Sequence, residues 1–424
     1  MKKLIKMKKI IGSTFFALLV TYTCFSTPYS LQLDIAQAES RFLQKNLLLL
    51  SAKYNINIAK ALEQQAKLWN NPTISIEQNI YNQYTDKYFD MSSTGQSVVQ
   101  IQQLILLAGK RNKQVQMQKY NTAISEYQFY DLMRTLRLEL TSNFYSLHFS
   151  QQKLKALNKQ IIPLRDLELA YQEQLKKGNV SLKEVSRLRS LLFKLETDRI
   201  SLVNEELGFT AALKTLLAVK GDTTLKPLYK ESISSWLENK KLAELEEEAK
   251  SNRSDLLAYE TNVKMQQANY RLQKANAIPD INVGGAYDRA GSYIYNYYAM
   301  TLSFSLPVYN RNQHYIKIAK DQIDQSKLDY ENTALSLSNE VNFSYMRALE
   351  FHRSYATFSK SAFDNVEELQ NAVIENYQKR NINLMEFVDF YESYKDNISA
   401  FLDLQLAREK ALEELNYTIG KKIN

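Results

Sequence analysis

The chain has 424 residues, of which 45% are hydrophobic and 24% charged, so it holds enough apolar material for one large or two ordinary folded domains. This composition excludes an intrinsically disordered protein. Only 10 glycines and 6 prolines occur, and because these residues are the usual helix breakers, long uninterrupted helices are expected. A single cysteine excludes an intrachain disulfide framework and a cysteine metal cage.

Residues 1–30 have the pattern of a secretory signal peptide whose cleavage site is uncertain. Five lysines among residues 1–9 precede an apolar run at residues 10–25. Removing these lysines would lower the formal net charge from +8 to +3, which takes away most of the electrostatic case for nucleic-acid binding. Cys24 lies at the end of the apolar run and is a candidate lipidation site, although the bulky Tyr22 fits a lipoprotein processing site poorly.

The rest of the chain divides into two similar halves, residues 31–230 and 231–424. Pro72 and Pro279 each follow a helical pattern and open a strand-like one, and Gly221 pairs with Gly420 near the ends. Alternation predicts strands at about 72–81 and 96–106 in the first half and at about 279–289 and 295–308 in the second. The predicted order in each half is helix, two strands, a very long helix, a tight turn and a returning helix.

The last predicted strand alternates between a large apolar face and a small polar face. Its apolar face carries Met300, Leu302, Phe304 and Leu306, and its small face carries Ala299, Thr301, Ser303 and Ser305. A membrane β-barrel strand has this pattern, with apolar residues toward lipid, and so does a sheet packed on a soluble core. Tyrosines crowd both strand-to-strand connections, at residues 81–88 and 287–298, where an aromatic belt would lie, and they favour the membrane interpretation.

Two very long helices are predicted, at residues 110–177 and 311–379. An unbroken helix of the first length would extend roughly 100 Å, which exceeds an ordinary globular domain. Apolar residues recur at coiled-coil spacing along these segments, as at Leu147, Leu154, Leu157, Ile161 and Leu164. Pro163 is expected to kink or end the first helix.

These elements, their duplication and their motifs together resemble the TolC family of outer-membrane efflux proteins. The motifs are the proline before each first strand, the run 104–111 ending in Ala108-Gly109-Lys110-Arg111, and the run 305–313, Ser-Leu-Pro-Val-Tyr-Asn-Arg-Asn-Gln. The last run is most similar to the heavy-metal-efflux subgroup. The resemblance implies a mainly α fold with a β-barrel contribution: a homotrimer in which each chain gives four strands to a barrel of twelve, continued by an α-helical barrel.

The resemblance also implies location, partners and function. It predicts a channel in the outer membrane of a Gram-negative-type bacterium, in contact with lipid and with a large periplasmic part, that gives heavy metals, drugs or other solutes a passive exit. The implied partners are a periplasmic adaptor protein and an inner-membrane pump of the resistance-nodulation-division type. No cofactor and no nucleic-acid partner are expected.

Two sets of residues are candidate functional sites. The turns Gly178-Asn179-Val180 and Arg380-Asn381-Ile382 match the hairpin tips with which the family meets its adaptor, and they also fit a plain helix reversal. Arg380 stands where the family usually has glycine. Glu386 and Asp389 share a helix face by i, i+3 spacing; the family places acids here to narrow the periplasmic aperture and favour cations, and ordinary solvated acids would have the same spacing.

An enzyme is not expected, because no catalytic constellation occurs in the sequence. His148, His314 and His352 lie far apart on predicted helices, so a metal site is not expected either. The alternative from another class is a periplasmic coiled-coil adaptor or scaffold with a soluble β-domain. An adaptor normally has one central hairpin, whereas this sequence has a tyrosine-rich strand pair and a long hairpin in each half, which favours the channel.

Overall fold

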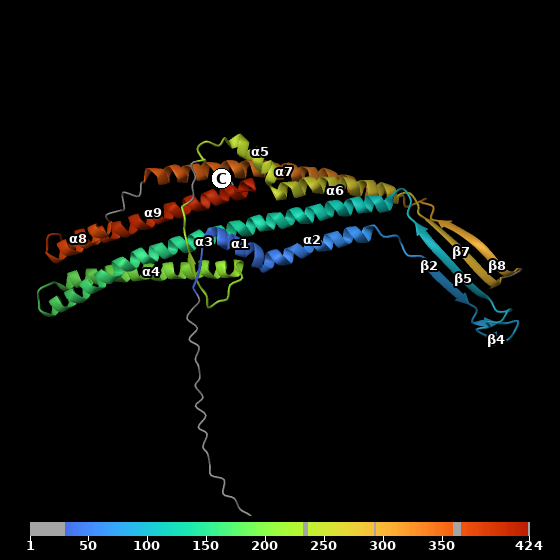
Figure 1. Cartoon of the computed structure of the whole chain (residues 1–424), viewed down its shortest axis with the longest axis horizontal. Coiled ribbons are helices and arrows are strands. Elements are labelled where there is room, and N and C mark those ends of the chain that lie inside the picture. The colour runs from blue at the N-terminus through green and yellow to red at the C-terminus, as the bar shows by residue number, and fades with distance from the viewer. Residues whose placement is uncertain (1–29, 232–235, 292–293, 359–365, 423–424) are drawn as a thin grey trace, which may run out of the picture.

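The computed structural model describes residues 30–231, 236–291, 294–358 and 366–422. All of the predicted signal peptide except Ser30 lies outside these residues, and so does Cys24. The molecule is elongated, with a β-sheet at one end and helices that run from it to two hairpin ends at the other (Figure 1). The prediction of a mainly helical fold is confirmed.

The helices follow one another in two sets. The first half has α1 (Ile35–Lys45), α2 (Leu47–Ala66), α3 (Lys110–Lys176) and α4 (Leu182–Leu216). The second half has α5 (Leu242–Asn252), α6 (Ser254–Asn276), α7 (Gln313–Thr357), α8 (Val366–Gln378) and α9 (Leu384–Ile419). None of the helices in the described ranges is both long enough and apolar enough to cross a membrane.

The main sheet has four strands, β2 (Thr73–Gln78), β5 (Ser97–Ile105), β7 (Ile281–Ala290) and β8 (Tyr295–Phe304). Their order is β2-β5-β7-β8, and every neighbouring pair is antiparallel. The β5–β7 pair joins the two halves of the chain. Two small sheets complete the fold: β1 (Ser30–Leu33) pairs in parallel with β6 (Thr224–Pro227), and β3 (Tyr81–Asn82) pairs with β4 (Lys87–Tyr88).

The strand register places one continuous apolar face across the main sheet. Ile76 lies opposite Val99, Val99 opposite Tyr287, and Tyr287 opposite Tyr298. The same face carries Ile74, Ile101, Ile105, Ile281, Val283, Met300, Leu302 and Phe304. It also carries Gln103, whose amide donates to the carbonyls of Asn70 and Leu104. The opposite face is mostly small or polar: Ser75, Gln100, Gln102, Asn282, Gly284, Ala286, Thr301 and Ser303.

Three hydrophobic cores hold the helices together. One surrounds Phe42 and Phe144 where α1, α3 and the end of α4 meet the small parallel sheet. A second packs α5, α7 and α9 around Leu245 and Val341. The third joins both hairpins far from the main sheet, with Leu164 and Phe387 fully buried. Helices that share several separate cores in this way form a long body rather than a globule.

Helix α3 runs without interruption through Pro163, so of the two expected outcomes, a kink or a helix end, the helix end was wrong. Proline in a helix interior removes one backbone hydrogen bond and costs about 3 kcal/mol. The residues beside it offset this cost, because Ile161 is 2% and Leu164 0% exposed in the third core. The 67 residues of α3 extend roughly 100 Å at 1.5 Å per residue.

The second predicted long helix is not continuous. Helix α7 ends at Thr357, and Phe358 has non-helical backbone angles of φ −93° and ψ 76°. Serine and threonine are frequent in the sequence on both sides of this end, and their hydroxyls compete for backbone groups. Thr357 Oγ1 accordingly donates to the Arg353 carbonyl. Helix periodicity continued across this break, which is why the sequence suggested one helix.

The ends of the two halves also pair differently from the prediction. Both α4 and α9 end in a left-handed residue, which is Ala218 (φ +49°) after α4 and Gly420 (φ +82°) after α9. Ala218, rather than Gly221, is therefore the structural counterpart of Gly420. A Cβ atom at Gly420 would lie 3.0 Å from the carbonyl carbon and oxygen of Asn252, so close packing against the α5–α6 link requires glycine there.

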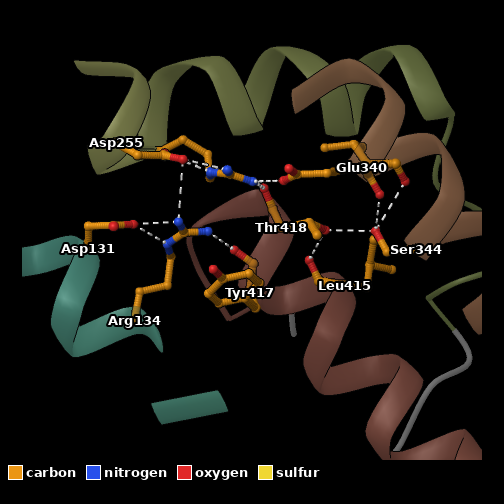
Figure 2. Close-up of polar contacts among 10 residues, drawn as sticks. Asp131, Arg134, Asp255, Glu340, Ser344, Leu415, Tyr417 and Thr418 are labelled. Atoms are coloured by element: carbon orange, nitrogen blue, oxygen red, sulfur yellow. Dashed lines mark hydrogen bonds and ion pairs between the residues drawn. The ribbon is translucent and has the colours of Figure 1, made fainter. Parts of the chain in front are cut away.

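A buried polar network, here called the C-terminal junction, holds the end of α9 (Figure 2). Arg253 links α5 to α6 and is 4% exposed. Its guanidinium donates to Asp255 Oδ1 at 2.8 Å, to Glu340 Oε2 at 2.8 Å and to the Thr418 carbonyl at 3.2 Å. From α3, Arg134 donates to the Tyr417 carbonyl at 2.8 Å. Burial raises the pKa of Asp255, but hydrogen bonds and charge from Arg253, with Arg134, hold it below its usual value.

Candidate functional site: the two hairpin tips

The first hairpin tip closes helix α3 with a glycine in the left-handed conformation. Gly178 has φ +77°, its amide donates to the Leu175 carbonyl at 2.9 Å, and the Asn179 amide donates to the Gln174 carbonyl at 2.9 Å. These two bonds form a Schellman motif, which satisfies carbonyls at the end of a helix. A Cβ atom at Gly178 would meet nothing within 4 Å, so the backbone conformation alone favours glycine here.

The second tip repeats this motif with arginine in place of glycine. Arg380 has φ +61°, its amide donates to the Tyr377 carbonyl at 3.0 Å, and the Asn381 amide donates to the Asn376 carbonyl at 2.8 Å. A non-glycine residue in this conformation costs about 1–2 kcal/mol. Arg380 therefore adopts the same turn geometry as glycine would, but with backbone strain.

The side chain of Arg380 joins the two tips. Its Nη2 donates to the Asn179 carbonyl at 3.2 Å, across 201 positions of sequence. The pKa of Glu184, behind the first tip, is lowered mainly by the hydrogen bond that its carboxylate accepts from the Ser181 amide. The nearby positive charge of Arg380 lowers it further. The structure thus brings together the two turns that sequence analysis singled out separately.

An aromatic stack fixes the second hairpin beneath its tip. Tyr377 of α8 stacks on Tyr171 of α3, with ring centroids 5.4 Å apart, and on Phe387 of α9 at 4.5 Å. Phe387 in turn contacts Tyr391 at 4.7 Å. Both α9 rings are 0% exposed, so the tips are mounted on a rigid core and not on a loose loop.

Both returning helices begin with a capping box. Ser181 accepts from the Glu184 amide while the Glu184 carboxylate accepts from the Ser181 amide at 2.8 Å. Asn383 and Glu386 make the same reciprocal pair, also at 2.8 Å. Sequence analysis overlooked this role, although a Ser or Asn followed by Glu three residues later is its signature.

The two candidate aperture acids therefore have different surroundings. Glu386 is exposed, yet one carboxylate oxygen is engaged by its own helix cap. Asp389, one turn further along α9, is also exposed. Both acids are thus open to solvent, whereas Phe387 between them is buried.

Three ion pairs join α9 to the first hairpin above the tips. Lys153 of α3 pairs with Asp403, Asp198 of α4 pairs with Lys395, and Lys194 of α4 pairs with Glu392. All three have at least one partly exposed member, so each contributes little to stability, in the range of about 0–1 kcal/mol. They set the register of one hairpin against the other more than they hold the two together.

The described residues contain no group of His, Cys, Asp and Glu side chains that could hold a metal ion. His148 is a packing residue, with its ring 5.0 Å from that of Tyr229, and burial lowers its pKa. His314 is exposed near the start of α7.

Comparisons with known proteins show what the chain is similar to. Residues 245–421 match the family model described as outer membrane efflux protein. The matched residues lie in the second half of the chain and make up somewhat less than half of its length. This similarity supports the predicted role of an outer-membrane channel. The assignment to a heavy-metal-efflux subgroup stays a prediction.

Solved structures share the fold of this chain over nearly its whole length. The CmeC outer membrane channel of Campylobacter jejuni has 14% identity and a TM-score of 0.74 over 91% of this chain and 85% of that one. The outer membrane protein VceC of Vibrio cholerae has 13% identity and a TM-score of 0.73 over 92% and 97%. A membrane protein from Pseudomonas aeruginosa has 15% identity and a TM-score of 0.74 over 91% and 92%. No curated protein matches the sequence.

Proposed function

We propose that this protein is the outer-membrane channel of a tripartite efflux system and gives solutes a passive exit from the periplasm or from a pump. The observation that carries the proposal is the main sheet, which exposes one apolar face and one polar face at the end of a long helical body. Met300 is 83% exposed, Ile76 74% and Leu302 62%. Soluble monomers rarely expose a continuous apolar face of this extent.

The sheet requires further copies of the chain. Its order leaves β2 and β8 at the edges, without an outer partner among the described strands. Unpaired strand edges are untenable in hydrocarbon, because their amide and carbonyl groups would lose water without gaining hydrogen bonds. Three copies with four strands each would close a wall of twelve, with the apolar face toward lipid and the polar face toward a water-filled interior. The homotrimer implied by the family resemblance agrees with this count.

Aromatic residues at the far end of the sheet support the same orientation. Tyr84 is 99% exposed and Tyr88 73% exposed, beside the β3–β4 turn, while Tyr295 is 69% exposed at the start of β8. Tyrosine is enriched where a membrane meets water, because its ring is apolar and its hydroxyl polar. The opposite end of the molecule would then extend into the periplasm, with the hairpin tips toward the inner membrane.

The tips are the proposed contact with a periplasmic adaptor protein. The adaptor would link the channel to an inner-membrane pump, for which the family resemblance implies the resistance-nodulation-division type. Exposed turns mounted on a buried aromatic core can present a defined surface without reorganising, which lowers the entropic cost of docking. Choice of cargo rests with the pump, since an exit duct needs no specific pocket.

Cysteine labelling tests the orientation of the sheet. The mature chain has no other cysteine if the predicted signal peptide is removed. In liposomes, a water-soluble maleimide is expected to label S75C and T301C on the polar face and to spare I76C and M300C on the apolar face. Equal labelling of the two pairs, or release of the protein from membranes by carbonate without detergent, would refute the channel and leave a soluble scaffold.

The aperture acids have a separate test. E386A/D389A is expected to reduce cation preference in planar bilayers while the channel still conducts, because rings of acids favour cations at a constriction. Since Glu386 also caps α9, the variant E386Q, which retains an acceptor oxygen for the Asn383 amide, separates loss of charge from loss of the cap. Unchanged selectivity in both variants would remove the aperture role and leave the channel proposal standing.

A further inference from the structure

The acidic and basic side chains at the two tips differ in how far partners within the chain engage them. Four carboxylates lie in or beside the turns, and each is engaged on its own helix: Glu173 by Lys176, Glu184 by the Ser181 amide, Glu375 by Lys379, and Glu386 by the Asn383 amide. Local partners hold the pKa values of Glu173, Glu184 and Glu375 below the usual value. The acids at the tips are thus already satisfied.

The basic side chains at the tips are less engaged than the acids. Lys177, Lys183 and Arg187 are all exposed, and the ion pairs found in the described parts of the chain include none of the three. Arg380 donates to a neutral carbonyl of the first tip, that of Asn179, and the nearby Glu184 already accepts the Ser181 amide. We call these four residues the basic tip surface. Charge left without internal partners at the end of a rigid rod is available to a partner molecule.

The position of Lys183 argues against a purely local role. It is the second residue of α4, where the partial positive charge of a helix N-terminus disfavours a cation by a few tenths of a kcal/mol to about 1 kcal/mol. Lys183 and Arg187 are spaced i, i+4, so they share one face and repel each other. Arg380 likewise occupies a strained left-handed position. Lys183, Arg187 and Arg380 therefore each lower the stability of the isolated chain.

An apolar side chain lies within this surface. Leu182, the first residue of α4, is 68% exposed beside Lys183, while Val180 in the turn is half-buried. An apolar centre with charges around it is the usual composition of a specific protein contact, in which the apolar residue supplies affinity and the charges select the partner. Solubility alone would be served by the charges without the exposed leucine.

We propose that the basic tip surface selects its partner by charge: it binds an adaptor whose helical-hairpin tip carries acidic residues around an apolar one. Arg380 positions the two tips relative to each other through the Asn179 carbonyl, so that both present one surface. This inference rests on the proposed function, because it names the chemistry of the partner that docks at the tips.

Two designed hairpins serve as probes in the test. They are disulfide-closed antiparallel helical hairpins, identical except for three residues at the turn, which are glutamates in one and lysines in the other. Binding to the full chain in detergent is measured by biolayer interferometry at 50 and 300 mM NaCl. The glutamate probe is expected to bind at least about tenfold tighter at low salt, from three exposed ion pairs of modest strength, and the preference should shrink at high salt.

Charge-reversal variants locate the effect. K177E/K183E/R187E should invert the preference between the probes, whereas K53E/K317E/K320E, which reverses three exposed lysines on α2 and α7 away from the tips, should leave it unchanged. R380G should weaken binding of the glutamate probe about threefold, by freeing the tips from each other and removing one cation. Circular dichroism of each variant confirms that the helices persist.

The proposal would be overturned if wild type bound both probes equally, if the tip reversal had no more effect than its control, or if only vesicles of phosphatidylglycerol, and not the glutamate probe, bound through the tips. Planar-bilayer conductance of the same preparations distinguishes failure of the charge selection from failure of the proposed function. A wild-type chain that conducts without telling the probes apart refutes the charge selection alone, while one that does not conduct refutes the proposed function.

Discussion

Replacing Arg253 by methionine tests whether the C-terminal junction holds the end of α9. Methionine fills a similar volume, so the packing of the Arg253 side chain is largely kept while its hydrogen bonds are lost. The variant removes the Arg253 donor from Asp255, Glu340 and the Thr418 carbonyl, while the contact of Asp255 with Arg134 in Figure 2 remains.

The expected cost is smaller than for a fully buried ion pair. Breaking a buried pair by removing one member costs about 3–5 kcal/mol. Here the Glu340 side chain is 46% exposed, so water replaces the lost partner, and Asp255 retains Arg134 at 3.6 Å. The remaining cost is that of the buried Thr418 carbonyl and the weakened Asp255 contact, which together give about 2–3 kcal/mol.

Amide hydrogen exchange of the protein in detergent measures this locally. Exchange at Thr418 and Gly420 is expected to show an opening free energy lower by about 2–3 kcal/mol in R253M. The matched control is K264A, which removes the exposed Lys264–Glu260 pair of α6 and should change the opening free energy by less than about 0.5 kcal/mol. If R253M costs no more than K264A, the junction does not anchor α9 and the reasoning from burial is wrong.

Three further predictions concern the tips and the junction. F387A should destabilise the second hairpin by about 3–5 kcal/mol, because this ring is 0% exposed, whereas F193A, with 74% exposure, should change chemical denaturation by less than about 0.5 kcal/mol. G420A should cost at least about 1 kcal/mol more than G178A, since both are left-handed and only Gly420 lies against backbone; equal costs would contradict this packing. Folding lowers the pKa of Asp255, so ionised Asp255 stabilises the folded state above its unfolded pKa of about 3.9, and this contribution is lost as the pH falls below that value. The stability deficit of D255N relative to wild type should therefore shrink between pH 6 and pH 3. A constant deficit would contradict the ionised role.

The sequence was informative wherever a pattern is local. Period-2 alternation located the sheet, and the observed β7 and β8 overlap the segments expected at residues 279–289 and 295–308. Helix-breaking residues were scarce, so α3 could be anticipated almost to the residue. The tips were found because Gly178 and Arg380 occupy matching positions in two similar halves. Each of these inferences uses neighbours in the chain, whose spacing the sequence contains.

Other features depended on contacts between distant residues. Pro163 stays inside a helix because α4 and α9 bury the residues around it, and α7 ends at Thr357 although the helical periodicity continues. The buried junction at Arg253 gives no local signal, since it also needs Glu340 and the Thr418 carbonyl as partners of Arg253, and Arg134 as a partner of Asp255.

The sequence by itself determined the alternating strands, the long helices and the two turns, because periodicity and backbone preference act over a few residues. Only the tertiary structure decided that the apolar sides of four strands merge into one face, because strand register is a property of pairs. It also decided that the two tips meet, through the hydrogen bond from Arg380 to the Asn179 carbonyl, since a contact across 201 positions depends on how the helices pack.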